Sequence, residues 1–87
     1  MSVVTETQVL RLADVRAAVS SGEAQRLRVA AQLSIGEVAN AIGVDQSTVW
    51  RWEQGARKPR GEGALAYGEL IKALRQKSPA DYKRESA

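Results

Sequence analysis

Gly43 separates two short stretches that each place apolar side chains on a single helical face. On its N-terminal side, Val38 and Ile42 are four residues apart, which brings them to the same side of a helix. Glycine readily adopts the left-handed conformation that ends a helix, and Asp45 is a good N-cap for a second one. The apolar positions of that second stretch are Val44, Val49 and Trp52. Residues 35–54 therefore predict two helices that turn at a glycine and share one core.

The outward side of the second stretch carries amide, hydroxyl, aromatic and guanidinium groups, which are suited to contacting base edges in DNA. These residues are Gln46, Ser47, Trp50 and Arg51. With Ala39, and with the run from Trp52 to Gly55 that precedes a basic loop, they resemble the helix-turn-helix of the Cro and phage-repressor type, also called the XRE family. The resemblance covers about residues 22 to 75. Apolar spacing alone would also suit any pair of amphipathic helices in a small α protein.

The resemblance implies a lambda-repressor-like DNA-binding domain: an all-α, compact bundle of about five short helices with a central helix-turn-helix. It implies that the four outward residues contact bases. Backbone contacts are expected from Ser34, Ile35, Gly36, Thr48, Gln54, Arg57, Lys58 and Arg60. It also implies a structural ion pair between Arg28 and Glu53. The family commonly has a glutamine, which touches a phosphate, at the first position of the first motif helix, where this chain has Ile35.

The formal net charge of +3 is concentrated in one segment. Residues 46–60 contain four basic side chains and one acidic side chain, and the basic and acidic residues elsewhere are equal in number. A basic cluster on an otherwise balanced domain is typical of a polyanion-binding site. A solvated surface face is the alternative interpretation.

Helix signals flank the central pair. Thr5 and Gln8 form a capping-box pattern, which predicts a helix at about residues 6–19. Its expected apolar face is Val9, Leu12, Val15 or Arg16, and Val19. We expect this N-terminal extension, residues 1–20, to cover the core or, alternatively, to pair with a partner protein.

Two further capping boxes are predicted. Ser20 and Glu23 suggest one for a helix at about 21–32, and Ser34 and Glu37 suggest another at the entrance of the first motif helix. The helix at 21–32 is expected to pack through a narrow stripe of small and apolar residues. That stripe is Ala24, Leu27, Ala30 and Ala31.

Residues 56–61 are expected to form a loop, because Pro59 cannot donate a helical hydrogen bond. A helix at about 62–76 follows, in which Gly68 indicates a close contact or a bend. Its apolar face is Leu65, Tyr67, Leu70, Ile71 and Leu74. The sequence thus suggests a DNA-binding domain at 21–77, followed by a disordered tail at 78–87.

Composition narrows the function. A chain of 87 residues has room for one domain, and the absence of cysteine and histidine excludes the usual zinc sites, disulfides and thiol or imidazole catalysis. We expect no enzyme activity, no cofactor and no metal. No segment approaches the ~20 apolar residues that cross a bilayer, so we expect a cytoplasmic protein of a bacterial or phage-infected bacterial cell.

The leading hypothesis is a Cro-like or short phage-type repressor, a transcription regulator that binds a palindromic operator in double-stranded DNA as a homodimer. The helix after Gly61, with Tyr67 and Leu70 or Leu74 partly exposed, is the first expected dimer surface, and the N-terminal helix is the second. One alternative is an antitoxin that binds a partner protein and its own promoter. Another is an excisionase-like architectural protein, which requires a β-hairpin after the recognition helix.

Overall fold

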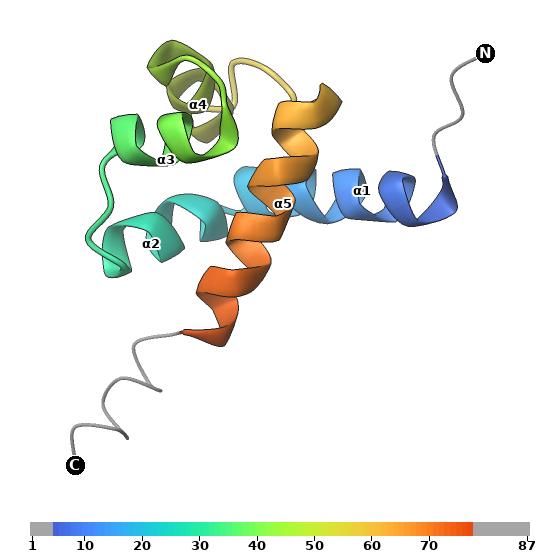
Figure 1. Ribbon diagram of the computed structural model, residues 1–87, viewed down its shortest axis with the longest axis horizontal. Helices are drawn as coiled ribbons and strands as arrows, with labels where there is room; N and C mark the ends of the chain where they lie inside the picture. The colour runs from blue at the N-terminus through green and yellow to red at the C-terminus, as the bar shows by residue number, and fades with distance from the viewer. Residues whose placement is uncertain (1–4, 78–87) are drawn as a thin grey trace.

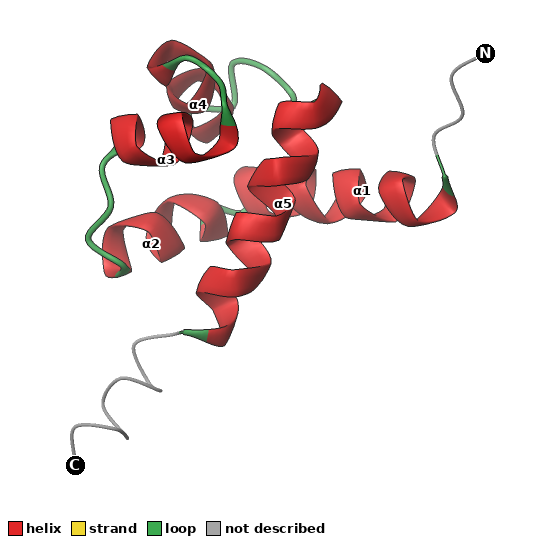
Figure 2. Ribbon diagram, in the orientation of Figure 1, coloured by secondary structure: helices red, strands yellow, loops and turns green. Residues whose placement is uncertain are grey.

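The computed structural model describes residues 5–77, and within this range the chain forms five helices and no strand (Figures 1 and 2). They are α1 (Glu6–Ser20), α2 (Glu23–Ala30), α3 (Ile35–Ile42), α4 (Gln46–Glu53) and α5 (Gly61–Gln76). The expected all-α bundle with a central helix pair is confirmed. The tail that we expect to be disordered, residues 78–87, lies outside the described residues.

The central pair, α3 and α4, forms as the sequence predicts. Ser34 caps α3: its side chain accepts a hydrogen bond from the Glu37 N–H, and the Glu37 carboxylate accepts one from the Ser34 N–H. Gly43 ends the helix in the left-handed conformation, with φ 77°. Asp45 occupies the N-cap position of α4, but its side chain makes no capping hydrogen bond. Backbone geometry at Gly43 therefore sets the turn.

A single core lies between the helices. It contains Val38, Ala39 and Ile42 from α3, Val49 and Trp52 from α4, and residues of α1, α2 and α5. α1 contributes Val15, Ala18 and Val19, α2 contributes Ala24, and α5 contributes Ala64, Tyr67 and Ile71. Because all five helices contribute, the orientation of α4 depends on elements far away in the sequence.

α1 crosses α5 at a glycine. A Cβ on Gly68 would lie 2.7 Å from Val15 Cγ2, closer than side chains normally approach. The close contact expected at Gly68 is thus confirmed, and Val15, Ala18 and Val19 of α1 are buried. α1 therefore contributes directly to the core, and the division of the chain at residue 20 stays a prediction.

The N-terminal half of α1 extends beyond the bundle (Figure 1). Val9, expected on the buried face, is 51% exposed, and Leu10 is 63% exposed. That expectation was wrong because the helices that cover α1 contact it nearer its C-terminal end, where Val15 and Val19 are buried.

The predicted capping box of Ser20 and Glu23 is wrong. Ser20 is the last residue of α1, and Gly22, in the left-handed conformation, precedes α2 without a side-chain cap. The Glu23 carboxylate instead pairs with Arg75 of α5, with Nη2 and Oε1 2.7 Å apart. Ala30, expected on the packing stripe of α2, is exposed at the end of that helix.

Tyr67 also differs from expectation. It was predicted to be partly exposed on a dimer surface, but it is buried against Trp52. Leu70 and Leu74 are half-buried. The face of α5 that carries Tyr67 therefore belongs to the core, because Trp52 of α4 stacks on the Tyr67 ring.

None of the helices between residues 5 and 77 has the length and apolar character needed to cross a membrane.

Candidate nucleic-acid interface

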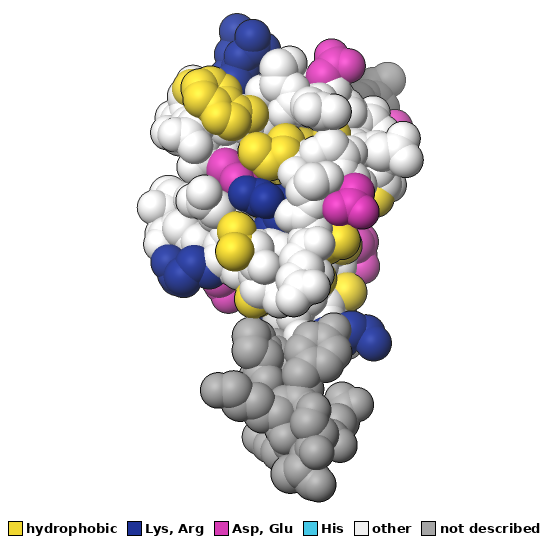
Figure 3. All heavy atoms as spheres, turned by 90° about the vertical axis from the view of Figure 1, so that its left-hand side faces the viewer, with side chains coloured by type: hydrophobic (Ala, Val, Ile, Leu, Met, Phe, Trp, Pro, Cys, Tyr) yellow, Lys and Arg dark blue, Asp and Glu magenta, His cyan; other side chains and the backbone are white. Residues whose placement is uncertain are grey.

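The outward face of α4 carries the four residues that the sequence suggests as base contacts. Gln46, Ser47, Trp50 and Arg51 are all exposed, while Val49 and Trp52 on the opposite side are buried. Trp50 keeps 51% of its surface exposed, which is unusual for a tryptophan. Figure 3 shows basic side chains beside a large hydrophobic side chain at the end of the molecule that holds α3 and α4. The face thus combines apolar and hydrogen-bonding groups.

Gln46 rests on the first turn of α3. A Cβ on Gly36 would lie 2.8 Å from Gln46 Nε2, so only a glycine leaves room for the amide in this position. Gln46, Ser47 and Trp50 line a hollow of about 310 Å³ together with Ile35. Ile35 itself packs against the core. This chain therefore places an apolar side chain at the position where the resembling family commonly has a glutamine.

The N-terminus of α3 opens beside this hollow. The capping box uses the N–H groups of Ser34 and Glu37. No hydrogen bond among the described residues uses the N–H groups of Ile35 and Gly36, and such groups at a helix N-terminus attract anions. The same hydrogen bonds lower the pKa of Glu37, so its carboxylate is ionised next to these amides.

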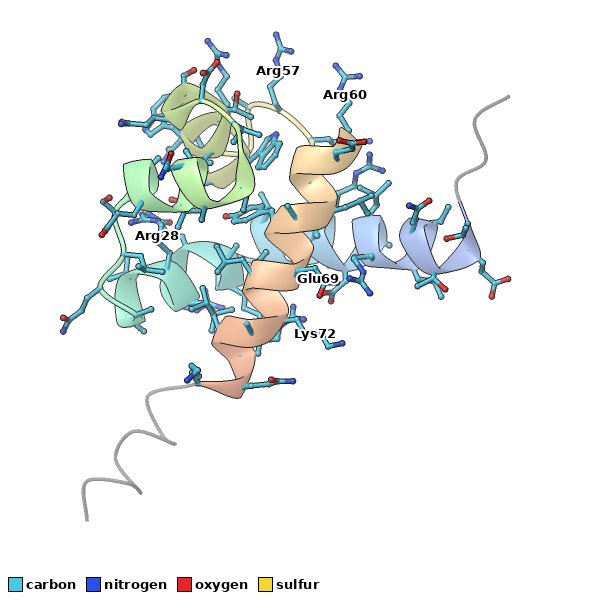
Figure 4. The ribbon with its side chains drawn as sticks, viewed as in Figure 1. Arg28, Arg57, Arg60, Glu69 and Lys72 are labelled. Carbon is cyan, nitrogen blue, oxygen red and sulfur yellow. The ribbon has the colours of Figure 1, made fainter. Side chains whose placement is uncertain are left out.

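The loop after α4 carries three exposed cations, Arg57, Lys58 and Arg60, which we call the basic loop. Gly55 ends α4 with φ 78°, and Pro59 is buried, so the loop is held against the bundle while its cations face outward. Figure 4 shows Arg57 and Arg60 pointing away from the bundle. The basic loop, Arg51, Trp52 and Thr48 line a hollow of about 170 Å³. Gln54, the C-cap of α4, is exposed.

An ion pair fixes α4 to α2, as the resemblance implies. Arg28 Nε and Nη2 donate to the Glu53 carboxylate at 2.6 and 3.0 Å, and Nη1 donates to the Leu33 carbonyl at 2.9 Å. The Glu53 side chain is only 1% exposed. The hydrogen bond from Arg28 to the Glu53 carboxylate raises the pKa of Arg28, so the guanidinium stays charged. A buried pair of this kind fixes the orientation of two helices more than it adds stability.

One residue near the basic loop was not expected to have a role there. Arg16 of α1 donates from Nε to the Pro59 carbonyl at 2.9 Å. Its partner is 43 residues away in the sequence, and helical spacing placed Arg16 only as a possible core position. No local signal connects these two positions.

Two short helices that turn at a glycine, the second with a polar outward face beside the exposed cations of the basic loop, define a helix-turn-helix DNA-binding domain. The comparison with family models agrees: a model described as a helix-turn-helix domain matches residues 21–75. The chain therefore belongs to the helix-turn-helix domain family, and its partner is DNA. Searches of curated proteins and of solved structures each found no match. α1 up to Ser20 lies outside the matched residues.

Proposed function

We propose that the protein is a sequence-specific transcriptional regulator of the Cro or short phage-repressor type, which binds an operator in double-stranded DNA. The observation that carries the proposal is the exposed face of α4, where Gln46, Ser47, Trp50 and Arg51 lie beside the basic loop. Amide and guanidinium groups can each make paired hydrogen bonds to a purine in the major groove, and an apolar ring can contact thymine methyl groups.

Backbone contacts flank these base contacts in the proposal. The N–H groups of Ile35 and Gly36 and the hydroxyl of Ser34 bind a phosphate on one side of α4. The basic loop binds phosphates on the other side, together with Thr48 and Gln54. Contacts of this kind set the register of α4 in the groove without reading sequence.

We further propose that the operator is palindromic and is bound by a homodimer, because one helix-turn-helix reads too few base pairs to be selective in a genome. Tyr67 is buried, so the surface that we favour is now the N-terminal half of α1. Val9 and Leu10 are exposed there on a helix end that projects from the bundle, and a second copy would cover them.

Selection of bound sites from random duplex DNA tests the proposal. We expect enriched inverted repeats whose half-site centres are about one helical turn apart, ~34 Å, because two recognition helices must enter successive major grooves on one face. Failure to enrich any sequence would contradict sequence-specific regulation. Enriched sites without inverted symmetry would contradict only the homodimer.

Sedimentation tests the dimer surface separately. Leu10→Glu should shift the protein to the monomer, because a charge replaces apolar area in the interface. Val29→Glu is the matched control, since Val29 is 57% exposed on α2, away from the surface in question. Equal sedimentation of wild type and Leu10→Glu would exclude α1 as the dimer surface.

A second candidate function is an antitoxin that binds a partner protein and its own promoter. The exposed Val9 and Leu10, outside the residues matched by the family model, favour it. Co-purification of a small co-encoded protein, lost in Leu10→Glu, would support this alternative. The excisionase-like alternative has no such support, because α4 is followed by a loop and α5, and residues 5–77 contain no hairpin wing.

A further inference from the structure

Arg16 connects α1 to the basic loop through a single hydrogen bond. Its Nε donates to the Pro59 carbonyl, and Pro59 is itself buried. An arginine has five N–H donors, and this contact uses one of them. The terminal amino groups of Arg16 form no ion pair or hydrogen bond among residues 5–77. The side chain therefore has donors left at the edge of the basic loop.

Arg16 also lines an open hollow of about 400 Å³ whose other lining residues are almost all cationic. It is lined by Arg16, Ala56, Arg57, Lys58 and Arg60. The basic loop also lines the smaller hollow beside Arg51 and Thr48 of α4. The two hollows thus lie along one loop, and together they form a basic track from α4 to α1.

Four cations without a carboxylate partner among the described residues are gathered along this track. Three arginines elsewhere have carboxylate partners: Arg11 pairs with Glu69, Arg28 with Glu53, and Arg75 with Asp14 and Glu23. Within the described chain, no carboxylate lies within ion-pair distance of Arg16 or of the three cations of the basic loop. Cations that share a hollow repel one another, and an anion in the hollow relieves that repulsion.

We propose that Arg16 extends the backbone contact of the basic loop to α1, so that Arg16 binds a further phosphodiester of the bound duplex next to the groove that α4 enters. Arg16 holds the loop through Nε and binds the phosphate through its terminal amino groups, in the planar geometry that suits phosphate oxygens. This proposal deepens the proposed function and rests on it. It gives α1, which the family model does not cover, a direct part in DNA binding.

The test uses the full chain and a duplex recovered by site selection, with affinity measured over a salt series. The logarithm of the affinity falls as the logarithm of the salt concentration rises. Removing one phosphate contact reduces the magnitude of this slope by about 0.9 for duplex DNA. We expect this decrease for Arg16→Gln. Lys72→Gln is the matched control, because Lys72 is exposed on α5 and points away from the basic loop (Figure 4). It removes the same charge and should leave the slope almost unchanged.

Two additional measurements separate phosphate binding from a purely structural role. Arg16→Lys keeps the charge but not the guanidinium geometry, so it should restore the slope while affinity stays below wild type. Neutral methylphosphonate linkages can be placed in the duplex one at a time. At the phosphate that Arg16 binds, the neutral linkage should weaken DNA binding by wild type and leave DNA binding by Arg16→Gln unchanged. If Arg16→Gln fails to fold, the same scan on Arg16→Lys replaces it: the phosphate bound by the guanidinium is the one whose neutralisation weakens binding more in wild type than in Arg16→Lys.

An unchanged slope in Arg16→Gln would overturn the proposal, as would an equal decrease in Lys72→Gln. A slope that falls in Arg16→Gln and is not restored by Arg16→Lys would also overturn it, because Arg16 would then act only by holding the loop. Absence of DNA binding by wild type would instead contradict the proposed function itself.

Discussion

Trp52 of α4 stacks on Tyr67 of α5, with ring centroids 5.4 Å apart and planes inclined by 27°. Both rings are buried, and their contact joins the second helix of the helix-turn-helix to the longest helix of the described chain. Trp50, two residues away on the same helix, is exposed. The two tryptophans therefore have separate roles, one in the core and one on the surface.

Trp52→Ala should unfold the domain or nearly so. Loss of a buried tryptophan costs roughly 3–5 kcal/mol, against a total stability that is small for a domain of this size. Trp50→Ala should leave the melting temperature almost unchanged and weaken DNA binding. Thermal denaturation and binding to the selected duplex measure the two effects, and an exchange of effects between the variants would contradict the orientation of α4.

Tyr67→Phe should stabilise the protein, most of all in alkali. The Tyr67 hydroxyl is buried without a hydrogen-bond partner among the described residues, and an unsatisfied group of this kind costs about 1–3 kcal/mol. Burial also raises the pKa of Tyr67 to about 12 from its ordinary value of 10. Because the unfolded state loses the phenolic proton first, wild-type stability should fall as the pH rises from 10 towards 12.

The Phe variant lacks this titration, so its advantage should grow over the same range by about 2–3 kcal/mol. Urea unfolding at several values between pH 8 and pH 12 measures the difference. A constant difference between the two proteins would show that the Tyr67 pKa is not raised by folding.

Breaking the partly buried pair of Arg28 and Glu53 should destabilise the protein, whereas replacing both residues with apolar ones should cost much less. Arg28→Met leaves the Glu53 charge buried without a partner, which costs about 3–5 kcal/mol. Arg28→Met combined with Glu53→Leu should recover much of that loss. The exposed pair of Arg11 and Glu69 is the control, since Arg11→Met should cost less than about 1 kcal/mol. Additive effects of the two substitutions in unfolding experiments would exclude coupling between Arg28 and Glu53.

Gly36→Ala should make the protein more stable and less selective. Alanine in a helix is favoured over glycine by about 0.5–1 kcal/mol, but the added Cβ displaces the Gln46 amide from α3. Base preference should then relax at the position that Gln46→Ala also affects. The double variant should show no further change there. Relaxation at a different base pair would mean that Gly36 does not position Gln46.

Base-contacting and backbone-contacting residues should differ in their salt dependence. Arg51→Ala should relax the preference at one base pair per half-site, since a paired hydrogen bond discriminates by about 1–3 kcal/mol. Lys58→Ala should weaken binding to all sequences alike and lower the salt slope by about one. Binding to the operator and to scrambled duplexes over a salt series measures both effects. If Lys58→Ala instead lost base preference at one position and kept the salt slope of wild type, Lys58 would be a base contact and its assignment to the DNA backbone would be wrong.

The sequence by itself determined the parts of the protein that depend on near neighbours. The capping box of Ser34 and Glu37, the left-handed turn at Gly43, and the separation of Trp50 from Trp52 all follow from helical spacing and backbone preferences within a few residues. The exposure of the polar face of α4 was predictable for the same reason.

Only the tertiary structure decided which faces are covered. The exposure of Val9, the burial of Tyr67 and the pairing of Glu23 with Arg75 depend on where α5 crosses the other helices. The bond from Arg16 to Pro59 joins residues 43 positions apart, and no periodicity records such a contact. Helix spacing reports which residues share a side of one helix. The partner that covers that side is set by the packing of the whole chain.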